Sequence, residues 1–217
     1  MMNSSDVIKH AEDYVRKVFA SDSSGHDWWH AYRVRNLALY IAKEEKADLY
    51  IVELAALLHD ISDVKFNADE ASGLKKVSYF LMQERIPDKI TAAVLYVIKN
   101  VSFKGAGVQT KPESIEAMVV QDADRIDAIG AIGIARVFAF GGHFKEEMYN
   151  PDVKPRMHSS FEEYDKRQGH TINHFYEKLL LLKDRMNTKT AKELAEHRHN
   201  FMKEYLKEFF DEWEGKA

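Results

Sequence analysis

Residues 54–66 read LAALLHDISDVKF, in which five apolar residues, 54–58, are followed by the dipeptide His59-Asp60. Asp48 is a suitable N-cap for a helix over 49–61, and the apolar spacing of this segment predicts that one face is buried. An imidazole and a carboxylate at the end of a buried helix are costly unless they are paired or coordinated. The alternative is that the aspartate is solvated and that the histidine interacts favourably with the dipole at the C-terminus of the helix. If only the dipeptide is considered, this alternative is favoured.

The helical spacing of apolar residues continues along the whole chain. All four prolines fall between periodic segments, which leaves room for long helices. Because no alternating strand pattern, repeat or linker is present, the sequence predicts an all-α fold, a single helical bundle over residues 1–217. A motif core spans roughly residues 26–138, and helices over 158–213 cover it or form the surface of a homodimer. Besides 49–61, helices are expected at 5–19, 27–46, 70–84, 88–100, 113–138, 158–184 and 188–213, with a loop at 139–157.

The composition excludes several classes of protein. The 217 residues are 45% apolar and 30% charged, which is enough for a real core and argues against disorder. Lys and Arg (31) nearly balance Asp and Glu (35), so we do not expect a nucleic-acid-binding protein. Ten histidines and no cysteine exclude disulfides, thiolate zinc sites and a cysteine nucleophile. Any metal ion must therefore bind imidazole and carboxylate groups.

Neither a signal peptide nor a membrane span is apparent. The first residues, MMNSSDVIKHAEDYVRK, lack a basic head followed by an apolar core. No stretch approaches the roughly 18 apolar residues that a membrane span needs. We therefore expect a cytoplasmic protein that does not bind membranes.

Two histidines precede the His59-Asp60 dipeptide at helical spacing. His26 and His30 are four residues apart, so they lie on one face of the helix expected at 27–46 or at its start. Such a pair can ligate one metal ion, or it can be two unrelated residues of a polar first turn. Taken alone, the second alternative is favoured.

A later segment, 118–138, is apolar almost all round and yet holds three aspartates. At 100° per residue, Asp124 and Asp127 lie about 60° apart, whereas Asp122 lies about 160° from Asp124 and points elsewhere. Buried carboxylates require a cation, which is either Arg125 or a metal ion. With the two earlier segments, the order is H…HD…D, and two imidazoles with two carboxylates suit a divalent ion that keeps open positions for water.

The three segments together resemble a known family. GHDWWHAYRV (25–34), LAALLHDISDVKF (54–66) and QDADRIDAIGAIGIAR (121–136) are similar to motifs of the HD-domain superfamily of metal-dependent phosphohydrolases. More narrowly they resemble its small bacterial, YpgQ-like branch of nucleotide pyrophosphohydrolases, and the resemblance covers most of the chain. It implies an all-α HD domain with one divalent ion, Mn first, with Mg, Co, Ni or Fe as alternatives. The metal ligands that it implies are His30, His59, Asp60 and Asp124.

Asp124 is preferred to Asp127 because the triplet Ala123-Asp124-Arg125 resembles the ligand segment of the stringent-response hydrolases. That branch has an asparagine four residues after the ligand, where this chain has Ala128. This departure leaves open whether Asp127 supplements or replaces Asp124.

The resemblance also implies catalytic details. Asp63 falls where the stringent-response branch keeps an acid near the attacking water, so it either orients or deprotonates that water or is an ordinary loop aspartate. Binuclear HD phosphodiesterases have extra histidines between the HD pair and the last aspartate. No histidine occurs between Asp60 and Asp124 here, which indicates a mononuclear site.

A phosphohydrolase must also neutralise the phosphates of its substrate. The resemblance implies a small phosphorylated substrate, a nucleoside or deoxynucleoside triphosphate cut to the monophosphate and pyrophosphate. A 5′-nucleotidase or another phosphomonoesterase, and a nucleotide-sensing module without turnover, are the alternatives. Base and sugar preference, native metal and oligomeric state stay open. The candidate substrate-binding residues are Arg33, Lys65, Lys104, Arg125, Arg136, His26 and Asp127.

Overall fold

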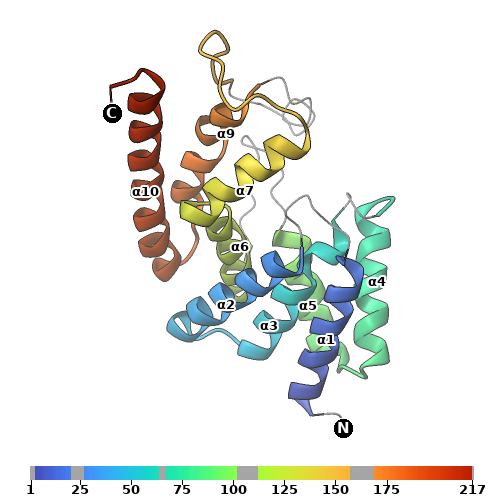
Figure 1. Ribbon diagram of the computed structural model, residues 1–217. Coiled ribbons are helices and arrows are strands. Elements are labelled where there is room, and N and C mark those ends of the chain that lie inside the picture. Colours follow the sequence, from blue (N-terminus) through green and yellow to red (C-terminus); the bar gives the residue numbers. More distant parts are fainter. Residues whose placement is uncertain (1–2, 21–26, 64–66, 102–111, 157–168, 217) are drawn as a thin grey trace. The chain divides into compact units, whose positions relative to one another are not determined.

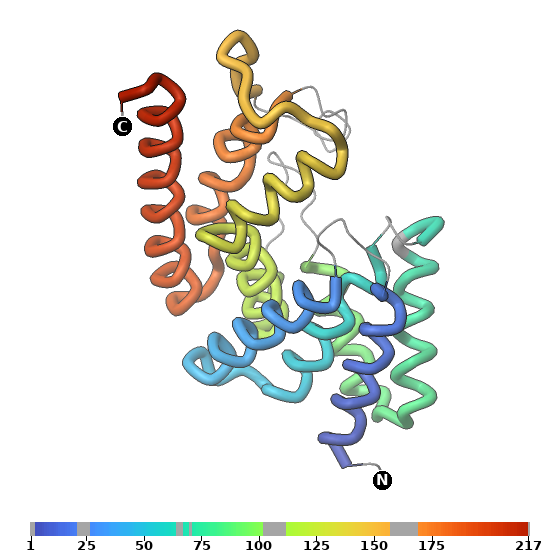
Figure 2. The backbone as a smooth tube through the Cα atoms, in the orientation of Figure 1, coloured from blue at the N-terminus to red at the C-terminus, as the bar shows by residue number. Residues whose placement is uncertain are grey.

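Helices form every regular element of the computed structural model, which describes residues 3–20, 27–63, 67–101, 112–156 and 169–216 (Figure 1). Within these ranges there is no strand, which confirms the predicted all-α fold. The backbone trace in Figure 2 shows the same succession of helices from the N-terminus to the C-terminus. His26, Lys65 and Lys104, three of the residues predicted to bind substrate, lie outside the described residues.

The chain divides into two compact units, and the boundary falls inside one helix. Of the described residues, those up to 101 and 112–124 form the first unit, and those from 125 onward form the second. Helix α6 (Ile115–Asp127) therefore contributes most of its length to the first unit and its last three residues to the second. A single HD-type domain over residues 1–217 stays a prediction.

The first unit is built around α3. Its elements are α1 (Ser4–Val18), α2 (Trp28–Glu45), α3 (Leu49–Leu58), the 3-10 helix η1 (His59–Ser62), α4 (Glu70–Gln83), α5 (Asp88–Val101) and most of α6. Helix α3 packs against α1, α2 and α5. The last five residues of α3 are all apolar, and Leu54, Leu57 and Leu58 among them are fully buried. The residues that follow α3 are therefore held at the centre of this unit.

The second unit has an aromatic core. It contains α7 (Gly130–His143), α9 (Thr171–Glu177), the 3-10 helix η2 (Leu179–Arg185) and α10 (Lys189–Trp213). Helix α10 packs against α7 and η2, and α9 packs against the same two elements. Phe138 of α7 contacts Phe175 of α9 and Tyr205 of α10, with ring centroids 6.2 and 6.3 Å apart. These edge and tilted contacts are the ones that aromatic side chains prefer.

The predicted helix over 49–61 is corrected at its C-terminal end. Asp48 is its N-cap, as expected, and accepts hydrogen bonds from the backbone amides of Tyr50 and Ile51. The α-helix ends at Leu58, however, and His59-Asp60 begins the tighter turn η1. The Ser62 hydroxyl donates to the His59 carbonyl at 3.0 Å, a local bond that stabilises this turn.

The predicted helix over 113–138 is wrong, because the chain breaks at Ala128–Ile129 and forms α6 and α7. Gly130 has a φ of 79°, which lets the backbone change direction there, and the apolar pattern gives no sign of it. Helix α7 also runs on to His143, so the loop expected at 139–157 begins later. Of the helix expected over 158–184, residues 158–168 lie outside the described part of the chain, and the rest forms α9 and η2 in place of one helix.

The bounds of the other helices agree closely with the expected ones. The segments predicted at 5–19, 27–46, 70–84, 88–100 and 188–213 are found as α1, α2, α4, α5 and α10, each shifted by one residue or less at either end. Among the described helices, none is by itself long and apolar enough to cross a membrane; only the broken pair α6 and α7, taken together, passes that test.

Replacing Gly130 with alanine is expected to lower the free energy of unfolding by about 1–2 kcal/mol, the cost of a left-handed conformation for an L-residue. The added methyl group would also lie 3.0 Å from Cγ of Arg198, which is anchored by a 2.7 Å hydrogen bond to the Ile126 carbonyl. Urea unfolding measures this loss. Gly142→Ala is the control, since nothing lies within 4 Å of its added methyl group. Equal stabilities of the two variants would contradict the expected strain.

Candidate metal centre

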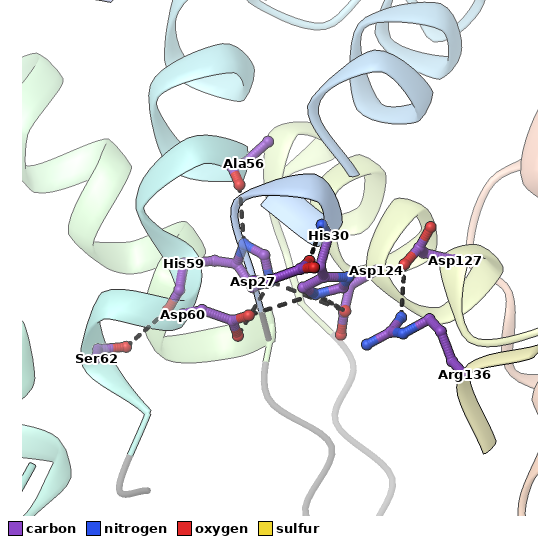
Figure 3. A network of polar contacts seen from close by, with 9 residues as sticks. All are labelled: Asp27, His30, Ala56, His59, Asp60, Ser62, Asp124, Asp127 and Arg136. Carbon is purple, nitrogen blue, oxygen red and sulfur yellow. Dashed lines mark hydrogen bonds and ion pairs between the residues drawn. The ribbon is translucent and has the colours of Figure 1, made fainter. Parts of the chain in front are cut away.

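The ring of His59 is oriented by the helix that precedes it. Its Nδ1 lies 2.8 Å from the carbonyl oxygen of Ala56, and because a carbonyl only accepts, Nδ1 carries the proton (Figure 3). In the neutral imidazole, Nε2 then presents its lone pair. This Nε2 is buried and makes no hydrogen bond within the described part of the chain. A backbone carbonyl behind a histidine is the usual support of a metal ligand.

His30 approaches from the first turn of α2. The carboxylate of Asp27, the N-cap of this helix, accepts a 2.8 Å hydrogen bond from the His30 backbone amide and so fixes the start of the helix. The side chain of His30 is buried, and its ring lies edge-on to that of His59 with centroids 5.3 Å apart. The two imidazoles therefore meet from different helices.

Two carboxylates complete the cluster. His30 Nε2 lies 3.4 Å from Asp60 Oδ2 and 3.4 Å from Asp124 Oδ1. His59 Nε2 lies 3.2 Å from Asp60 Oδ1 and 3.9 Å from Asp124 Oδ1. Asp60 is buried, whereas the side chain of Asp124 keeps 27% of its surface exposed. The cluster therefore has a solvent-accessible side at Asp124.

Asp124 favours its charged form. Burial raises the pKa of this carboxyl, but its interactions with the rings of His30 and His59 outweigh that effect and hold the pKa below its usual value. The charge of Asp60 acts in the opposite direction. An ionised carboxylate at this position is the form that binds a cation.

The four side chains suit a divalent metal ion. Single ligand atoms of His30, His59 and Asp60 all lie within 4.8 Å of one another, and Asp124 Oδ1 lies within 3.9 Å of both ring nitrogens. Two imidazole nitrogens and two carboxylate groups form the N/O donor set that Mn, Fe, Co, Ni or Zn accept. The buried Nε2 of His59, which has no hydrogen-bond partner among the described groups, would find one in such an ion.

The turn that carries His59 and Asp60 is held from outside by residues that the sequence motif does not include. The side-chain amide of Asn67 donates 2.8 Å hydrogen bonds to the carbonyls of Ile61 and Asp63. On α4, a methyl group added at Gly73 would lie 2.5 Å from Cα and 2.7 Å from the carbonyl oxygen of Ser62. The backbone of η1 therefore packs directly on that of α4.

The other predicted residues of the first unit lie close to the cluster in sequence. Asp63 ends η1; its backbone amide donates to the Asp60 carbonyl at 3.1 Å, and its side chain is half-buried. Arg33 lies one turn after His30 on α2 and is also half-buried. The roles predicted for Asp63 and Arg33 stay predictions.

The remaining predicted residues make contacts inside the second unit. Asp127 is buried and accepts a 2.5 Å hydrogen bond from Arg136. Arg125 is buried as well, and its guanidinium donates to the carbonyl of Arg185 at the end of η2. Both arginines thus have structural partners, and their predicted substrate-binding roles stay predictions. His170 is the N-cap of α9, and its ring accepts a hydrogen bond from the backbone amide of Asn173.

Sequence reasoning missed four groups that orient the cluster. The capping role of Asp27 could have been found, because an aspartate immediately before a helical pattern is an N-cap signal. The Ala56 carbonyl, Asn67 and Gly73 gave no such signal. Their function depends on which backbone they contact in the folded chain, and no local pattern encodes that.

Comparison with known proteins agrees with this geometry. The HD domain family model matches residues 28–129, a segment that contains all four side chains. Over 205 residues the chain is 42% identical to YpgQ of Bacillus subtilis, covering 93% of this chain and 92% of that protein.

Solved structures extend the comparison. A Lactobacillus plantarum protein has a TM-score of 0.83 at 39% identity, with 96% of this chain and 97% of that one covered. An HD-superfamily hydrolase from Bacillus thuringiensis has a TM-score of 0.79 at 40% identity, with 98% and 100% covered. The structure of B. subtilis YpgQ in complex with ADP has a TM-score of 0.76 at 40% identity, with 97% and 100% covered. The resemblance inferred from the three sequence motifs is confirmed, and the chain belongs to the HD-domain superfamily.

Proposed function

We propose that this protein is a metal-dependent phosphohydrolase that cuts a nucleoside or deoxynucleoside triphosphate to the monophosphate and pyrophosphate. The observation that carries this proposal is the convergence of His30, His59, Asp60 and Asp124, from three segments of the chain, on one partly exposed point. Metal-bound sites with open positions activate water for attack on phosphorus. We further propose that residues 1–217 act as one HD-type domain.

One comparison supports a hydrolase, and another supports a nucleotide as the ligand. The B. thuringiensis relative is an HD-superfamily hydrolase, and YpgQ was crystallised with ADP. The similarity to each of these proteins extends over nearly the whole chain, so it includes the segments that carry the four candidate ligands. A nucleotide offers the phosphate oxygens that a divalent ion prefers as ligands.

The residues of the chain have distinct roles in this proposal. His30, His59, Asp60 and Asp124 would hold the divalent ion, with Mn as the first choice. When bound, the ion would act as a Lewis acid and lower the pKa of a water molecule. Asp63, at the end of the turn that carries Asp60, accepts the proton of the attacking water. Arg33, one turn after His30, holds the phosphate oxygens.

The proposal is tested by a screen of phosphate compounds against several divalent ions. Nucleoside triphosphates, nucleoside monophosphates and a general phosphomonoester are incubated with Mn, Mg, Co, Ni or Fe, and pyrophosphate is resolved from phosphate. We expect pyrophosphate and a monophosphate from the triphosphates, with Mn giving the highest rate. Release of phosphate from monophosphates would establish the 5′-nucleotidase alternative instead. Tight nucleotide binding without any product would establish a sensor.

A further inference from the structure

The first turn of α2 presents two large aromatic side chains to solvent beside the candidate metal centre. Trp29 keeps 57% of its surface exposed and Tyr32 keeps 40%. Their rings contact each other edge-on, at 82° with centroids 5.9 Å apart. Among the ring pairs of the described residues, none places another aromatic ring parallel to the indole of Trp29. The indole can therefore receive a planar group in a stacked arrangement.

This aromatic pair, Trp29 and Tyr32, stands on a rigid support. Asp27 caps the helix through its 2.8 Å bond to the His30 amide. Trp28 is buried, and the guanidinium carbon of Arg16 from α1 lies 3.8 Å from the centre of its ring. Both sequence neighbours of Trp29 are thus fixed: Trp28 by packing, and His30 by its contacts in the candidate metal centre. A preorganised side chain loses little entropy when it binds a ligand.

The position of Trp29 relative to the centre follows from the helix. Trp29 immediately precedes His30, and Trp29 and Arg33 are four residues apart, so they share a face next to that of His30. Around the helix, the side chains therefore change from buried His30 to half-buried Arg33 and then to exposed Trp29. A ligand whose phosphates lie at His30 has the rest of its structure within reach of the indole.

We propose that Trp29, supported by the edge of Tyr32, stacks on the base of the nucleotide. The inference rests on the proposed function, because it assumes that a nucleotide's phosphates bind at the cluster. Every base has a π-face, so a stacking residue accepts all of them and reads none by hydrogen bonds. The aromatic pair therefore contributes affinity for nucleotides over phosphate compounds that have no base, without strong selection among bases.

Calorimetry of the Mn-loaded protein with ADP and with inorganic pyrophosphate tests this role. Base–aromatic stacking predicts that Trp29→Ala weakens ADP binding roughly 5- to 150-fold and leaves pyrophosphate binding unchanged. Trp29→Phe retains a ring and should recover most of the affinity. The control is Tyr40→Ala, which removes an aromatic side chain that is 53% exposed on the same helix and should bind both compounds like the wild type.

Turnover supplies a second readout. With a nucleoside triphosphate we expect Trp29→Ala to raise KM and leave kcat nearly unchanged, since the stacked base takes no part in the chemical step. Unchanged ADP binding in Trp29→Ala, or an equal loss for ADP and pyrophosphate, would overturn the stacking role while the phosphohydrolase proposal stands. A wild-type protein that binds neither compound and hydrolyses no nucleotide would instead overturn the proposed function.

Discussion

Asp60→Ala is expected to abolish phosphohydrolase activity, with a loss of roughly 1000-fold or more. Asp60 offers one carboxylate oxygen to each imidazole, at 3.4 Å from His30 and 3.2 Å from His59, so its removal takes a ligand from the centre of the cluster. The Lewis-acid contribution of a metal ion is several kcal/mol, and each 1.36 kcal/mol is about tenfold in rate. Pyrophosphate release at saturating nucleotide and metal measures the loss.

The fold of Asp60→Ala should survive, which separates this effect from unfolding. Without a bound ion, the negative charges of Asp60 and Asp124 repel each other. The alanine therefore removes this repulsion as well as the metal ligand. Asp13→Ala is the matched control, because it makes the same change on an exposed position of α1 in the same unit. A wild-type rate for Asp60→Ala would refute the assignment of the site.

Gly73→Ala is expected to lower activity about 100-fold, although Gly73 contains no functional group. Its added methyl group would lie 2.5 Å from Cα of Ser62, closer than real contacts allow, and the obstacle is backbone. The turn η1 would have to move, and His59 and Asp60 would move with it. A displacement of about 1 Å at reacting groups can cost 100-fold in rate.

Two measurements separate this displacement from a general loss of stability. Overpacking costs about 1–3 kcal/mol, which urea unfolding detects. The Mn concentration needed for half-maximal activity should rise as well, because the ligands are misplaced. Gly142→Ala, whose added methyl group meets nothing within 4 Å, should change neither the rate nor the metal requirement. Normal metal dependence in Gly73→Ala would contradict the role given to the contact between α4 and η1.

The cluster could be predicted because its residues stand in short motifs with unusual local chemistry. A histidine and an acid after a run of buried leucines, and aspartates in an apolar helix, are expensive unless they share a cation. The structure brings together all four side chains that the resemblance implied as ligands. His26 cannot be compared, because it lies outside the described residues.

The local geometry around the cluster could not be predicted, for a physical reason. The apolar pattern runs unbroken through Gly130, so periodicity alone favours one helix where the chain forms α6 and α7. Likewise, the 3-10 turn at His59 depends on contacts with Asn67 and Gly73, which follow it in the sequence. Tertiary contacts of this kind override local propensity.

The content of divalent metal per chain tests the central claim most directly. Wild-type protein loaded with Mn and freed of excess ion should retain about one ion per chain, as expected for two imidazoles and two carboxylates around a single point. Asp60→Ala and a His59→Ala variant should retain almost none, while Asp13→Ala should match the wild type. Undiminished metal in the Asp60 and His59 variants would contradict the proposal that these side chains hold the catalytic ion.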